Sequence, residues 1–173
     1  MNSMKVFSRF WQLLAVTGLL VVSQTSQATQ QTDDLQEINT DNISQLVSQV
    51  GRDYYQQLDS LVKYYQLYQQ KRDPRGFNVW HLRGFSPSFN ERQSYYQDLL
   101  STASADAQLT ADNTVAIYSA VGTIARQLMI AFRDSDPEAY QLAVALIDEN
   151  NALMATQLKQ FQREAEVRTI LLN

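Results

Sequence analysis

The sequence predicts an all-α protein: an up-and-down four-helix bundle with one long loop between helices 1 and 2, after a cleaved signal peptide. Three observations predict this fold class. Apolar residues recur at steps of three and four along most of the chain after residue 40, as on one face of a helix. Apart from the one loop, the breaks between these stretches are tight or absent, which favours antiparallel neighbours. The first 28 residues have the composition of a secretory leader.

Residues 1–28 are the predicted signal peptide. Lys5 and Arg9 form its basic region, an apolar run follows over residues 10–22, and small residues precede the expected cleavage after Ala28. The run is shorter than the roughly 20 residues of a membrane span, although an uncleaved anchor is the alternative interpretation. No later segment looks apolar enough to cross a bilayer. We therefore expect a periplasmic or secreted protein.

Charge and cysteine content exclude several classes of function. The leader holds two of the 14 basic residues and none of the 18 acidic ones, so the remaining chain has a net charge of −6. That charge argues against a nucleic-acid partner. Export permits disulfides, yet the chain has no cysteine, so its stability must come from packing. The length after the leader is that of one domain.

The first helix follows a polar segment. Residues 29–39 lack aromatic side chains and are predicted to be a flexible lead-in, which leaves a single helical-bundle domain over residues 40–173. Thr40 or Asp41 is the expected N-cap of a helix of about 30 residues. Pro74 should end that helix, because the residue before a proline is disfavoured in the α region.

The second and third helices have weaker boundaries. Ser88 and Glu91 match a capping box, so the second helix is expected to begin there and to run to about residue 105. Thr110 is the expected N-cap of the third helix, over residues 111–133, which is apolar on nearly all sides and therefore central. Gly122 in this helix is expected to allow a neighbouring helix to approach closely.

The fourth helix is predicted from about Pro137, a proline in the first turn, towards Thr169. Its apolar positions repeat every 3.5 residues on average, which is the period of a coiled-coil seam. Asn151 interrupts this seam. A buried polar residue at such a position fixes register or oligomeric state, or bonds to a helix backbone or a water.

Most catalytic and metal chemistry has no residues to perform it. With one histidine and no cysteine, a Cys/His zinc site, a c-type haem attachment and a di-iron bundle are excluded within one chain. Asp134 and Asp136 begin like a calcium loop, but Ala139 and Ala145 stand where its glycine and glutamate belong. No phosphate loop or nucleophile elbow occurs. We expect no enzyme, no cofactor and no metal, although spacing does not exclude a serine beside His81.

Tyrosine doublets are the first feature with a functional interpretation. Neighbouring residues of a helix point about 100° apart, so one tyrosine of each pair enters the core and the other lies at its border. The alternative is an exposed face of tyrosine and glutamine that stacks on a ligand or partner. The doublets are Tyr54-Tyr55, Tyr64-Tyr65 and Tyr95-Tyr96.

The predicted loop, residues 73–89, is the second such feature. Helix connections in bundles usually take about 2–8 residues, and this one is longer. Its aromatic residues and Leu82 are expected to fold over the open end of the bundle, and its arginines to stay at the rim, where they receive an acidic partner or an anionic glycan. The candidate partner-binding residues are Arg75, Phe77, Trp80, His81, Arg83 and Phe85.

Three functional hypotheses follow. The leading hypothesis is an exported, non-enzymatic binding or adaptor protein that recognises a protein partner or an envelope polymer through residues 73–89. The second is a small-molecule carrier or sensor whose pocket lies inside the bundle, among the tyrosines and the third helix. The third is a structural homo-oligomer that pairs through the last helix.

Overall fold

The computed structural model describes residue 35 and residues 37–172, with side-chain surroundings as far as residue 163. The predicted signal peptide (1–28) and most of the predicted lead-in (29–39) lie outside the described residues. The helical elements are, in chain order, α2 (Ile43–Lys71), α3 (Pro74–Trp80), the π-helical turn η1 (His81–Phe85), α4 (Ser86–Leu100), α5 (Ala105–Asp134) and α6 (Pro137–Leu172).

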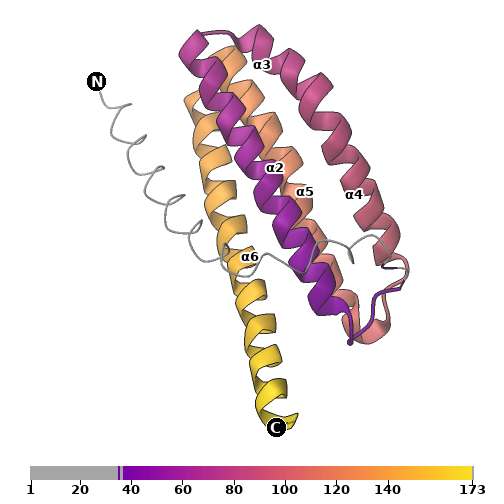
Figure 1. Cartoon of the computed structure of the whole chain (residues 1–173). Coiled ribbons are helices and arrows are strands. Elements are labelled where there is room, and N and C mark those ends of the chain that lie inside the picture. Colours follow the sequence, from indigo (N-terminus) through magenta and orange to yellow (C-terminus); the bar gives the residue numbers. More distant parts are fainter. Residues whose placement is uncertain (1–34, 36, 173) are drawn as a thin grey trace, which may run out of the picture. The chain divides into compact units, whose positions relative to one another are not determined.

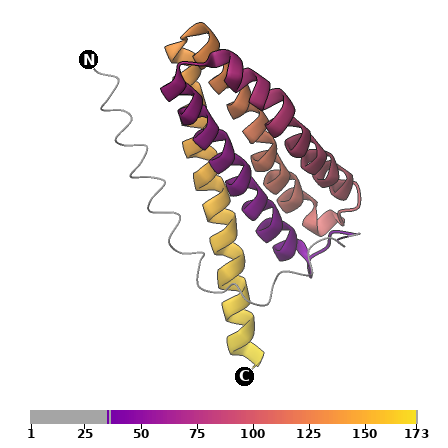
Figure 2. The same ribbon diagram turned by 45° about the horizontal axis from the view of Figure 1, so that its top comes forward.

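Figures 1 and 2 show α2, α5 and α6 alongside one another, with α3 and α4 end to end beside α5. Successive helical runs reverse direction, if α3, η1 and α4 are taken as one run (Figure 1). The prediction of an all-α, up-and-down four-helix bundle is confirmed.

The prediction of a long loop at residues 73–89 is wrong, because residues 74–89 are helical. Asp73 caps α3 by accepting the Gly76 N–H at 2.8 Å, and Pro74 occupies the first turn, where its missing N–H costs nothing. The later proline, Pro87, is the second residue of α4, which follows directly after η1. A proline ring clashes with the preceding helical turn, and the wider π turn relieves that clash. α2 thus ends before Pro74, as predicted, but a new helix begins at Pro74 and the chain stays helical past Pro87.

Two further predicted boundaries are corrected. Ser88 lies inside α4 and donates its hydroxyl to the Phe85 carbonyl at 3.0 Å, so it does not form a capping box. α5 begins at Ala105, not after Thr110, with Ser104 at the N-cap position. The close approach predicted at Gly122 is confirmed, since a Cβ there would lie 2.9 Å from the Phe89 ring.

The end of the predicted lead-in belongs to the core. Ile38 is fully buried, and its carbonyl accepts the Ser104 N–H at 2.7 Å. Asn39 and Asn42 then exchange hydrogen bonds with the backbone ahead of α2. The first helix therefore starts at Ile43, slightly later than the expected Thr40 or Asp41 cap implies.

The last helix starts as predicted, with Asp136 accepting the N–H groups of its first turn. Its buried face is displaced by one residue from the predicted seam at several positions. Asn150 is buried and donates to the Leu146 carbonyl at 2.7 Å, whereas Asn151 is half-buried and accepts the Tyr54 hydroxyl at 3.0 Å. Asn151 thus joins α6 to α2 within one chain.

α5 is the central helix, as predicted, because it contacts α2, α3, α4 and α6. By length and composition alone, α5 is also long and apolar enough to span a membrane. The expectation that no segment after the leader would be apolar enough is therefore wrong. A central bundle helix has this same composition, since its neighbours cover it on most sides.

Candidate functional site

The six candidate residues lie on α3 and η1 and divide into two groups. Phe77 and Phe85 are 1% and 3% exposed, so they are core residues. Arg75 and Arg83 are exposed, and neither makes an ion pair among the described residues. Trp80 and His81 are half-buried, so their exposure is intermediate between that of the two groups.

Aromatic side chains of α3, η1, α4 and α5, all buried except the half-buried Trp80, join into a continuous series, which we call the aromatic row. Ring centroids are 5–6 Å apart along it: Phe77–Trp80 5.7, Trp80–Phe85 5.8, Phe85–Phe89 5.5, Phe89–Tyr118 5.3 and Tyr118–Tyr96 5.2 Å. Each such pair contributes about 0.5–1.5 kcal/mol beyond its buried area. The aromatic row therefore fixes α3, η1 and α4 against the side of α5.

Two more contacts attach this row to α2. Trp80 stacks on Tyr64 with centroids 4.3 Å apart, and Phe77 meets Tyr65 edge-on at 5.5 Å. The aromatic residues thus pack inward, as the sequence predicts, but along the bundle and not over an open end. Leu82 does not join them, because it is 57% exposed.

A polar cluster holds the far end of the row. The Asp53 carboxylate of α2 accepts the Tyr96 hydroxyl at 2.6 Å and the Arg92 Nε at 3.0 Å. Burial, reinforced by that hydrogen bond, raises the pKa of Tyr96 above its ordinary value. The Tyr118 hydroxyl is also buried, with no hydrogen-bond partner in the described part of the chain, and burial raises its pKa as well.

The tyrosine doublets straddle the core border. Tyr54, Tyr65 and Tyr96 are buried, and the partner of each is half-buried. The alternative, an exposed face of tyrosine and glutamine, is therefore not supported, since none of the six doublet tyrosines is exposed.

His81 lies beside a serine, which sequence spacing left open. Its Nδ1 is 3.4 Å from the Ser86 hydroxyl, and its ring stacks on Phe85. Burial lowers the pKa of the imidazole, so it is neutral near pH 7. No carboxylate among the side chains described, which extend to residue 163, bonds to His81, so a charge-orienting third member of a triad is missing from that part of the chain.

The exposed side of α3 and η1 carries two apolar residues that the sequence analysis did not select. Val79 is 50% exposed and Leu82 is 57% exposed. Val79 lies four residues from both Arg75 and Arg83, so these side chains share one surface of the helix. We call Arg75, Val79, Leu82 and Arg83 the α3–η1 face. The i, i+4 spacing was present in the sequence, but it has meaning only if the segment is helical.

Comparison with protein-family models, curated proteins and solved structures finds no match to this chain. The function must therefore be inferred from the described residues themselves.

Proposed function

We propose that this chain is an exported, non-enzymatic binding protein that recognises an acidic, amphipathic segment of a partner protein through the α3–η1 face. The observation that supports this most is the pairing of two exposed apolar side chains, Val79 and Leu82, with two arginines that lack an ion-pair partner in the described chain.

Charge supports an acidic partner. The stretch from residue 74 to residue 90 has no acidic residue, although the chain as a whole is acidic. An arginine fork forms bidentate, charge-assisted hydrogen bonds with carboxylates. A partner with glutamates or aspartates at helical spacing would satisfy Arg75 and Arg83 together.

The aliphatic residues favour a protein over an envelope polymer. A glycan is usually held by exposed rings, but Phe77 and Phe85 are buried and Trp80 is stacked on Tyr64. Val79 and Leu82 instead match apolar side chains of a partner helix, whose anchors recur at steps of three and four residues. The aromatic row holds the face in place, which lowers the entropy cost of binding.

The test uses three synthetic helical peptides and fluorescence anisotropy. The first carries leucine and glutamate on one face, the second has glutamine for each glutamate, and the third has serine for each leucine. We expect the first peptide to bind most tightly. Arg75→Gln combined with Arg83→Gln, and separately Val79→Ser combined with Leu82→Ser, should each weaken it at least tenfold, the effect of losing charged hydrogen bonds or buried apolar area.

Leu142→Ser on α6 is the matched control, because Leu142 is also exposed but lies outside the face. Equal binding of the three peptides would overturn the proposal. So would binding of a sulfated polysaccharide, or of anionic lipid vesicles, that is stronger than binding of the first peptide.

Export is supported by the composition of residues 1–28. Sequencing the N-terminus of protein from an envelope or culture fraction tests it. The expected first residue is Thr29, and a chain that begins at Met1 would contradict cleavage.

A further inference from the structure

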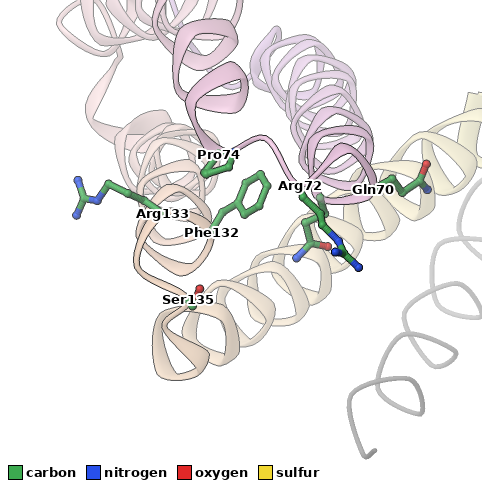
Figure 3. Close-up of a pocket in the computed structure, with 7 residues that line it drawn as sticks. Gln70, Arg72, Pro74, Phe132, Arg133 and Ser135 are labelled. Carbon is green, nitrogen blue, oxygen red and sulfur yellow. The ribbon is translucent and has the colours of Figure 1, made fainter.

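The end of the bundle where α2 and α5 finish contains a pocket of about 550 Å³, and two of its lining residues, Gln69 and Phe132, contact the buried Tyr65. Its lining comes from the α2–α3 and α5–α6 junctions and includes Gln69, Arg72, Pro74, Phe132 and Ser135. Figure 3 shows Phe132 projecting into the gap beside Pro74 and Arg72. The pocket is shallow and largely open to solvent, with a volume in the range of small-molecule sites, about 300–1,000 Å³.

The backbone is strained at two residues of this pocket. Arg72 and Ser135 have φ of 53° and 54°, and they are the positive-φ residues found in the described chain. Both are C-caps, the position where glycine adopts the left-handed conformation without strain. Residues with strained backbone conformations are found more often at functional sites than elsewhere. Here two such residues, Arg72 and Ser135, line the same pocket.

Arg72 is the cation that remains without a partner there. The neighbouring carboxylates are occupied: Asp73 and Asp136 cap the helices that follow them, and Asp134 pairs with Arg133 at 2.7 Å. Figure 3 shows Arg133 pointing outward. Arg72 makes no ion pair within the described residues, so its guanidinium is available to a ligand.

We propose that this pocket binds a small carboxylate with an apolar body, such as an aryl or short alkyl acid. The Arg72 guanidinium receives the carboxylate in a bidentate pair, and the Phe132 ring and Pro74 receive the apolar body. Gln69, held by its hydrogen bond to Tyr65 at 2.9 Å, and the Ser135 hydroxyl supply polar contacts at the rim.

The probe is phenylacetate, titrated into the full mature chain and followed by amide NMR shifts. We expect saturable shifts confined to residues 69–74 and 131–136. The neutral analogue 2-phenylethanol should bind at least tenfold more weakly, because it cannot form the charged pair. Absence of saturation with phenylacetate, or equal binding of the alcohol, would overturn the proposal.

Glycine variants separate binding from stability. Arg72→Gly should raise Tm, because glycine relieves the strained cap, and should weaken phenylacetate about tenfold to a hundredfold. Ser135→Gly should also raise Tm and weaken binding by a smaller factor. Arg52→Gln, at an exposed arginine of α2 that belongs neither to the pocket nor to the α3–η1 face, should change neither.

A fall in Tm in both glycine variants would show that the Arg72 and Ser135 side chains stabilise the helix ends. The backbone strain from which the site was inferred would then be absent, and the proposal would fail. Unchanged phenylacetate binding in Arg72→Gly would also overturn it. Neither outcome bears on the α3–η1 face, whose peptide test depends on Arg75 and Arg83.

Discussion

Two regions of this bundle are packed by different means. The core of α2, α5 and α6 is mainly aliphatic, with buried side chains that include Leu46, Val47, Leu61, Val121 and Ile124. In the second region, which we call the arm (α3, η1 and α4), four of the five buried side chains are aromatic. Those five are Phe77, Phe85, Phe89, Tyr96 and Leu99.

The difference explains how a peripheral segment is kept rigid. An aliphatic core distributes its stability over many small contacts and tolerates hydrophobic substitutions that conserve volume. The arm depends on a few large rings in one row and on Asp53 at its far end. It therefore presents a well-placed α3–η1 face, but losing one ring should release the arm before the core unfolds.

The largest predicted effect comes from Phe89→Ala. Phe89 stacks on Phe85 and Tyr118 in the middle of the row, and truncating a buried phenylalanine costs about 3–5 kcal/mol. We expect hydrogen–deuterium exchange to accelerate in residues 74–100 and to remain slow in α2 and α6.

Ile124→Ala in the aliphatic core is the control for that experiment. It should lower protection in all the helices together, because it lowers the free energy of global unfolding by about 2–5 kcal/mol. If Phe89→Ala also lowers protection uniformly, the arm and the core unfold as one cooperative unit. That result would contradict the claim that the arm is released before the core unfolds.

The second prediction compares two buried tyrosines of the row. Tyr96→Phe removes a hydrogen bond to the Asp53 carboxylate and should cost about 1.5–3 kcal/mol in urea unfolding. Tyr118→Phe removes a hydroxyl with no partner in the described chain, so it should be neutral or stabilise by about 1 kcal/mol. A larger loss for Tyr118→Phe would mean that its hydroxyl is bonded.

The smallest effect is predicted for two glycines. A Cβ at Gly122 would lie 2.9 Å from the Phe89 ring, which is stacked on both sides and cannot move away. Gly122→Ala should therefore cost about 1 kcal/mol, the strain of overpacking less the gain in helix propensity.

Gly51 is the matched position between α2 and α6. A Cβ there would meet the flexible ends of Leu158 and Met154 at 3.3–3.4 Å. Gly51→Ala should then be neutral or stabilise by up to about 1 kcal/mol, from helix propensity alone. Equal changes in stability for Gly122→Ala and Gly51→Ala would show that the Phe89 ring and the aliphatic side chains accommodate an added methyl group equally well.

The fold was largely predictable because its signals are local. Helical periodicity identified α2, α5 and α6, and Pro137 marked the start of the last helix. The packing of Gly122 against another helix was also predicted correctly. Each of these depends on residues within one helical turn or on a single small side chain.

The second helix was predicted from Ser88 and largely matches α4, whereas α3 and η1 were mispredicted as a loop because their helical structure depends on tertiary packing. Two prolines and two glycines in this segment favour a break in helical structure: Pro74, Gly76, Gly84 and Pro87. No local sequence pattern predicts a π turn. The rings that bury this segment against α2 and α5 compensate for those preferences. The aromatic candidates therefore became core residues, while the arginines remained exposed and Val79 and Leu82 joined them.

The central claim is that the α3–η1 face is the surface that binds an acidic, amphipathic partner. Amide NMR shifts during titration with the leucine–glutamate peptide test it most directly. We predict that the largest shifts occur at residues 75–83 and vanish in the Arg75→Gln, Arg83→Gln variant. Shifts centred on α6, or shifts that persist in that variant, would contradict it.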